Sequence, residues 1–151
     1  MNEIYLKAKE FKKRYPGTIS WRLKAHSKVV AKHLNPGEYV RFVFAAQKNN
    51  KSYQIFSTYM VVLTNKRILL AQKRLLFGYM FLAITPDMFN DVTVKSGIIW
   101  GKIVLDTVKE LVYLSNVSKS ALPVIETEIT EYMMREKKKF MKIEKKGEGM
   151  S

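Results

Sequence analysis

The chain has 151 residues, enough for one domain with flanking segments, and 47% of them are hydrophobic, which excludes a chain that is disordered throughout. It contains no cysteine, which excludes a disulfide framework and any thiolate site. The net charge is +14, and the basic residues are densest in residues 1–34 and 135–151. This balance favours anionic partners such as phospholipid headgroups, nucleic acid or an acidic protein, although charge also serves solubility alone.

Two basic helices are predicted at the start of the chain. Residues 2–14 place apolar side chains among lysines, and Pro16-Gly17 then breaks the pattern. We expect Thr18 to cap a second helix that runs to about Leu34. Three cations recur at every fourth position of this second helix: Lys24, Lys28 and Lys32. Such a stripe lies on one helix face and is suited to contact phosphates.

Seven short segments rich in aromatic and β-branched residues follow, and each is typical of a strand. The predicted strands are 39–47, 53–64, 67–74, 79–84, 91–95, 102–108 and 110–115. Asn65 is expected in a short hairpin turn, because asparagine tolerates a positive φ. Seven strands at this spacing predict a small antiparallel barrel or sandwich.

A helical period returns after Ser118, which together with Ser120 is a candidate N-cap. The apolar face of this predicted helix consists of Leu122, Ile125, Ile129 and Met133. We divide the chain into basic N-terminal helices (1–34), a central domain (35–135) and a basic tail (136–151). As a helix, the tail would either lie on an anionic membrane or end in solvent.

Two strand connections share one pattern, with two aliphatic residues followed by an aromatic residue and a glycine: Leu75–Gly78 and Ile98–Gly101. In one interpretation the glycine allows a tight turn and the aromatic ring closes the mouth of the barrel. In the other, connection order places the first, third and fifth connections at one end of a meander. Apolar tips surrounded by cations would then form a surface for an anionic membrane or a protein partner.

The residues expected to supply charge to this surface are Lys48, Lys51, Lys73, Arg74 and Lys102. Those expected to supply apolar contact are Leu76, Phe77, Ile99 and Trp100.

Three features together resemble the bacterial pleckstrin-homology (PH)-like domains, most closely the YokE-like group. They are "LNPGEYV" before the first strand, "VVLTNKRILL" across the second hairpin, and the two aromatic-glycine connections. The resemblance covers about residues 34–135. It implies an α+β fold in which a seven-stranded antiparallel half-open barrel is capped by the C-terminal helix. In this chain two N-terminal helices would precede that domain.

The resemblance also implies a bacterial or prophage-borne binding module without catalytic activity, and some bacterial relatives form oligomers. Eukaryotic PH domains that bind phosphoinositides carry a basic pattern across the first hairpin that ends in Lys/Arg-x-Arg. The corresponding segment here, "AQKNNKSYQIF", keeps Lys48 and Lys51 but has no arginine in the second strand. This departure argues against specific phosphoinositide recognition.

No pattern in the sequence indicates catalysis, a cofactor or a metal. His26 and His33 lack the further ligands that zinc needs, and we expect both to be partly exposed on the second helix. We therefore predict a non-catalytic cytoplasmic adaptor, without an integral membrane segment, that docks on an anionic membrane surface or a protein partner. Docking on lipid would make it peripheral at the inner face of the membrane. The alternative is a prophage-type inhibitor or assembly protein that binds nucleic acid or a nucleic-acid-associated host protein, and a homo-oligomer is compatible with both.

Overall fold

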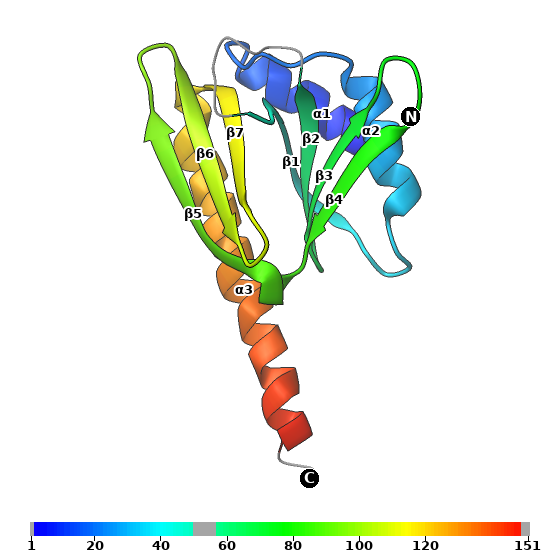
Figure 1. Ribbon diagram of the computed structural model, residues 1–151, viewed down its shortest axis with the longest axis vertical. Helices are drawn as coiled ribbons and strands as arrows, with labels where there is room; N and C mark the ends of the chain where they lie inside the picture. The colour runs from blue at the N-terminus through cyan, green and yellow to red at the C-terminus, as the bar shows by residue number, and fades with distance from the viewer. Residues whose placement is uncertain (1, 50–56, 149–151) are drawn as a thin grey trace.

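The computed structural model describes residues 2–49 and 57–148, except for the side chains of Phe140 and Glu148. Two helices lead into seven strands, and a long helix closes the chain (Figure 1). The helices are α1 (Glu3–Arg14), α2 (Leu23–His33) and α3 (Leu122–Glu148). The strands are β1 (Val40–Gln47), β2 (Thr58–Thr64), β3 (Ile68–Lys73), β4 (Tyr79–Ile84), β5 (Phe89–Ser96), β6 (Trp100–Thr107) and β7 (Leu111–Ser118). Two short 3-10 turns, η1 (Pro86–Met88) and η2 (Lys119–Ala121), precede β5 and α3.

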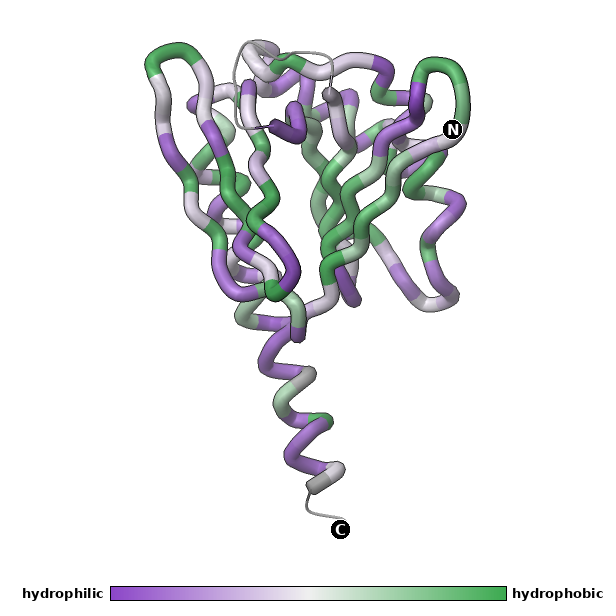
Figure 2. The backbone as a smooth tube through the Cα atoms, viewed as in Figure 1, coloured by the Kyte–Doolittle hydropathy of each residue, from purple (hydrophilic) through white to green (hydrophobic). Residues whose placement is uncertain are grey.

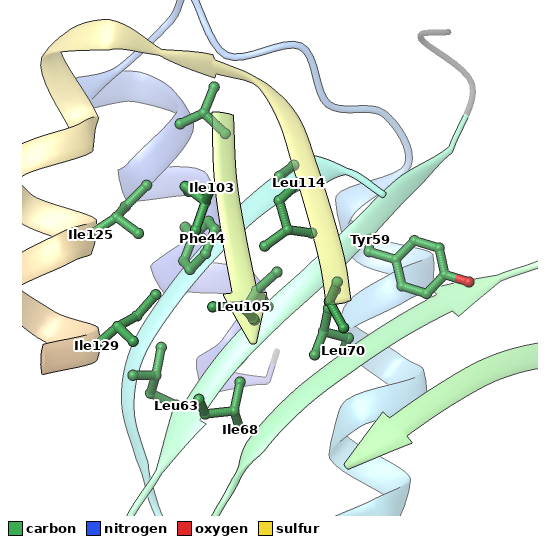
Figure 3. Packing of buried hydrophobic residues seen from close by; sticks show 14 of the residues in the cluster. Phe44, Tyr59, Leu63, Ile68, Leu70, Ile103, Leu105, Leu114, Ile125 and Ile129 are labelled. Atoms are coloured by element: carbon green, nitrogen blue, oxygen red, sulfur yellow. The ribbon is translucent and has the colours of Figure 1, made fainter. Parts of the chain in front are cut away.

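The strands form one antiparallel sheet in the order β4-β3-β2-β1-β7-β6-β5. The sheet curves into a half-barrel that stays open between its edge strands β4 and β5 (Figure 1). Helix α3 lies against β5, and its Ile125 and Ile129 are fully buried with Phe44 and Ile103 in one cluster (Figure 3). The predicted fold class is thereby confirmed: two N-terminal helices, seven antiparallel strands and a capping C-terminal helix.

Helices α1 and α2 cover the outer face of the half of the sheet formed by β1 to β4. Ile4 and Ala8 of α1 and Val30 of α2 form a second apolar cluster with Met60 and Leu69 of the sheet. Strand β2 is consequently buried at every position, because each of its two faces meets a core. The N-terminal helices therefore complete the packing of the sheet, since removing them would expose this face to water.

The segment between α1 and α2 corrects the predicted start of the second helix. Thr18 does not cap a helix; it is buried, and its Oγ1 accepts a hydrogen bond from the backbone N of Ser118. The backbone N of Ile19 donates to Asn116 O at 2.9 Å, so the chain runs extended beside β7 before α2 begins. Residue Arg22, with φ 54° and ψ 41°, provides the turn into the helix.

The two segments "LNPGEYV" and "LTNKR" contact each other across the base of the sheet. Asn65 Oδ1 accepts from the backbone N of Tyr39 at 2.8 Å. The buried Glu38 carboxylate accepts from Arg67 through two hydrogen bonds of 3.0 Å and from Thr64 Oγ1 at 2.6 Å. Burial raises the pKa of Glu38, but the hydrogen bonds from Arg67, the Asn35 backbone and Thr64 outweigh it and lower the pKa overall. This network gives both segments a structural role.

Helix α3 continues past the barrel and projects from the end opposite the β3–β4 and β5–β6 hairpins (Figure 1). Glu136 of this helix is buried and has Arg41 of β1, as well as Arg135 and Lys139 of the helix itself, within 4.0 Å. Beyond this residue the projecting part is predominantly polar (Figure 2).

Candidate functional site

The β3–β4 hairpin ends in an exposed apolar tip. Its last strand pair joins Lys73 to Tyr79, and the backbone N of Arg74 donates to Gly78 O at 3.1 Å. Gly78 closes the turn with φ 75°, a conformation that side chains disfavour. The exposed fractions of the three residues between Arg74 and Gly78 are 82% for Leu75, 84% for Leu76 and 85% for Phe77. No packing requirement of this chain accounts for such exposure of three large apolar side chains.

The β5–β6 hairpin carries a second apolar tip. The backbone N of Gly97 donates to Trp100 O at 2.9 Å, which leaves Ile98 and Ile99 alone at the turn. Their exposed fractions are 95% and 65%. Trp100 lies below the tip in β6, half-buried, and its Nε1 donates to Gly17 O at 3.0 Å. The apolar group at the extremity is therefore the isoleucine pair, while Trp100 packs beside the segment that links α1 to α2.

The two glycines of the repeated pattern have different physical roles. Gly78 supplies a positive φ at an open turn, with no atom within 4 Å of an added Cβ. Gly101 lies within β6, and a Cβ there would stand 2.4 Å from the Leu122 side chain of α3. The sequence interpretation of both glycines as turn residues is wrong for Gly101, which instead lets α3 approach the sheet.

Both tips reach the same end of the molecule along its longest axis, where Figure 2 shows each of them as hydrophobic. They belong to opposite edges of the sheet, so they flank the mouth of the half-barrel. Lys73 and Arg74 adjoin the first tip. Lys95 and Lys102 face each other across β5 and β6 below the second, and Lys119 Nζ donates to Ile98 O.

The first connection contributes less to this surface than the sequence analysis expects, as far as it is described. Lys48 is half-buried, and its Nζ lies 5.5 Å from the centre of the Tyr59 ring. Lys51 lies outside the described residues.

A groove of about 540 Å³ runs between α2 and the β3–β4 hairpin. Its lining residues are Arg22, Lys24, Ala25, Lys28, Val29, Lys32, His33, Lys73 and Tyr79. The predicted stripe of three lysines forms one side of it. Sequence reasoning missed the opposite side, because Tyr79 and Lys73 are brought to α2 by the fold over a separation of more than 40 residues. The local indication of this side in the sequence is the pair of aromatic residues near the start of β4, Tyr79 and Phe81.

His26 and His33 attach α2 to this hairpin. The Nδ1 atom of His26 accepts from the backbone N of Lys73 at 2.8 Å, and the ring is 2% exposed, which corrects the expectation that it is partly exposed. Burial and the charge of Arg22 lower the pKa of His26 to about 4, against a smaller opposing effect of a hydrogen bond with the Trp21 backbone. His26 is therefore neutral at pH 7, as an acceptor must be. His33 stacks on Phe81 with ring centroids 4.1 Å apart.

Within residues 2–49 and 57–148, no three His, Cys, Asp or Glu side chains gather as metal ligands would. Over the same residues, no helix has the length and hydropathy to span a bilayer.

A comparison with protein-family models shows to which family the chain belongs. The model described as the bacterial PH domain matches residues 34–131. The chain belongs to the bacterial PH domain family. The match is to the family as a whole and does not identify the YokE-like group. This PH domain thus spans β1 to β7 and the first part of α3, whereas α1 and α2 precede the matched residues.

Among solved structures, the chain is similar to the crystal structure of a pleckstrin homology domain from Shewanella amazonensis SB2B. The sequences are 17% identical, the TM-score is 0.47, and the similarity covers 76% of this chain and 90% of the other. No curated protein matches the chain. PH domains are generally non-catalytic and commonly bind lipids or proteins, so membership indicates a binding module.

Proposed function

We propose that this protein is a non-catalytic adaptor that docks peripherally on an anionic membrane surface. The contact would be made by the end of the PH domain that carries the β3–β4 and β5–β6 tips. The observation that carries the proposal is the exposure of five large apolar side chains at one end: Leu75, Leu76, Phe77, Ile98 and Ile99. Exposed apolar groups are unfavourable in water, and their transfer to the boundary between headgroups and acyl chains lowers the free energy.

The charge around the tips supports an anionic rather than a neutral surface. Lys73 and Arg74 stand at the base of one tip, and Lys95, Lys102 and Lys119 stand near the other. A cation close to an anionic leaflet contributes about 1 kcal/mol of binding free energy, so a handful of them adds to the apolar term.

Co-sedimentation with vesicles tests the proposal. We expect binding to vesicles that contain phosphatidylglycerol, weak binding to pure phosphatidylcholine, and a loss of affinity between 0.1 M and 0.5 M salt, because salt screens the cationic term. A tryptophan blue shift is expected on binding, since Trp21 is 49% exposed and lines a hollow with Arg74 and Leu75 at the base of the β3–β4 tip. Equal affinity for both vesicle types, or no affinity for either, would contradict docking on an anionic membrane.

A further inference from the structure

The groove between α2 and the β3–β4 hairpin is lined by positive charges that no acidic residue of the lining neutralises. Five of its nine lining residues are Lys or Arg, and no Asp or Glu lines it. The ion pairs among the described residues involve other cations, namely Lys7, Arg41, Arg67, Arg135 and Lys139. A concave surface with charge of one sign concentrates ions of the opposite sign. The groove therefore suits an anionic group.

The lysine stripe has a cost that packing does not explain. Lys24, Lys28 and Lys32 are neighbours at i, i+4 and i+8 on α2, and like charges at this spacing destabilise a helix. A different face of the same helix packs on the sheet, where Val30 is fully buried. The stripe contributes nothing to that packing, so a bound anion is the simplest compensation for its charge.

The walls of the groove add features of a site for an organic ligand. Val29 and Ala25 give it apolar surface, and Tyr79 places a hydroxyl 3.2 Å from His33 Nε2. His33 Nδ1 lies 2.7 Å from the carbonyl oxygen of Val29, which can only accept, so Nδ1 carries a proton. In the neutral ring Nε2 is then the acceptor, and Tyr79 donates to it, which leaves the lone pairs of the tyrosine oxygen for a ligand hydroxyl.

The position of the groove relates it to the apolar tip. Arg22 Nη1 donates to Lys73 O at 2.8 Å at one end of the groove, and Lys73 is the last strand residue before the tip. A tip inserted at the acyl boundary would hold this end of the groove at the level of the headgroups, which lie immediately outside that boundary. The occupant that fits both the charge and the position is a phospholipid headgroup.

We propose that this groove binds the phosphate and polyol headgroup of an anionic glycerophospholipid, an inference that rests on the proposed membrane docking. Lys24, Lys28 and Arg22 would bind the phosphate, and Tyr79 would contact a headgroup hydroxyl. Six of the nine lining residues come from α2, which precedes residues 34–131, the part that matches the family. The site is thus a feature that the N-terminal helices add to this PH domain.

The first experiment compares two charge-matched triple variants on phosphatidylglycerol vesicles. The groove variant is K24Q/K28Q/K32Q, and the control is K138Q/K142Q/K145Q on the exposed projecting part of α3. Since each lysine near an anionic surface is worth about a fivefold change, the groove variant is expected to lose affinity about 100-fold. The control should change it less than threefold, because Lys138 is roughly 24 Å along α3 from Leu122, beyond a Debye length of ~10 Å.

The second experiment locates the headgroup. Dihexanoyl phosphatidylglycerol below its critical micelle concentration is titrated into the protein and followed by NMR, with dihexanoyl phosphatidylcholine and glycerol phosphate as matched probes. We expect shifts confined to α2 and Tyr79 with the phosphatidylglycerol probe and no shifts with phosphatidylcholine. Y79F should weaken this binding severalfold and lower the melting temperature only slightly, because Tyr79 is exposed and its hydrogen bond to His33 lies at the surface.

The outcomes separate this inference from the docking proposal. Equal losses for the two triple variants, in a protein that still needs its tips for vesicle binding, would overturn the headgroup site and leave docking intact. Absence of vesicle binding by the wild-type protein would overturn both. Shifts with glycerol phosphate but not with the lipid probe would assign the groove to a soluble phosphate ester. Tight binding of a single-stranded oligonucleotide that the groove variant loses, without lipid binding, would assign it to nucleic acid; each of these two results overturns the headgroup proposal.

Discussion

The β3–β4 tip offers a direct test of membrane docking, because its side chains are almost free of intramolecular contact. We consider the double variant L76S/F77S. Leu76 and Phe77 are 84% and 85% exposed, so replacing them should change the free energy of unfolding by less than about 0.5 kcal/mol. Fully burying a Leu or Phe side chain is worth about 1.5–3 kcal/mol.

Insertion at the headgroup boundary buries these side chains incompletely. Taking about half of the combined value gives roughly 2 kcal/mol for the pair, which corresponds to about a 30-fold fall in the partition coefficient. The assay is co-sedimentation with phosphatidylglycerol vesicles over a range of lipid concentrations, alongside thermal melting of each variant.

The matched control is V108S/L111S. Val108 and Leu111 are also exposed, at 68% and 49%, but they lie at the β6–β7 connection, the opposite end of the half-barrel (Figure 1). This control should bind vesicles like the wild-type protein. A loss below about threefold for L76S/F77S, or an equal loss for the control, would refute the argument that the tip inserts.

Three further predictions concern stability. G101A should destabilise the fold by about 1–3 kcal/mol in urea, because its Cβ would overlap Leu122; an unchanged midpoint would contradict this. The pKa of His26 is depressed to about 4 in the folded state from an unfolded value near 6.5. The contribution of the neutral ring to the free energy of unfolding is therefore complete above pH 6.5 and is lost as the pH falls toward 4. That loss is at most about 3 kcal/mol, and H26Q should remove this part of the pH dependence. W100F should cost about 1 kcal/mol through the hydrogen bond to Gly17 while leaving vesicle affinity within threefold; a large affinity loss at unchanged stability would place Trp100 in the contact.

The sequence predicted the strands and the capping helix well because their side-chain periods are local. Leu122, Ile125 and Ile129 repeat at helical spacing, and all three are buried as expected, while Met133 is partly buried. The packing of α1 and α2 was not predicted. Its signal was β2, where "TYMVVLT" lacks the alternation of a strand with one wet face. An uninterrupted apolar run of that kind indicates a strand covered on both sides.

Only one side of the candidate site could be predicted from the sequence, because sequence patterns report local structure and not contacts between distant segments. The lysine stripe of α2 is a local pattern, whereas Lys73 and Tyr79 reach the groove through strand pairing and the hydrogen bond from Lys73 to His26. The repeated aromatic-glycine pattern, by contrast, suggested one shared role for two residues that differ in the structure. Gly78 is required by a positive φ, whereas Gly101 is required by the close approach of a helix.

Helix α2 joins the fold to the proposed headgroup site, and this decides how the site can be tested. Its inner face, with Val29 and Val30, covers Met60 and Leu69, so deleting the N-terminal helices would expose an apolar sheet face and confuse loss of binding with loss of structure. The lysines occupy a different face and make no ion pair among the described residues. Neutralising them should therefore leave the fold intact, or stabilise it slightly by relieving like-charge repulsion along the helix, while binding falls. Opposite changes in stability and affinity are typical of a functional charge cluster, and a structural one would lose both together.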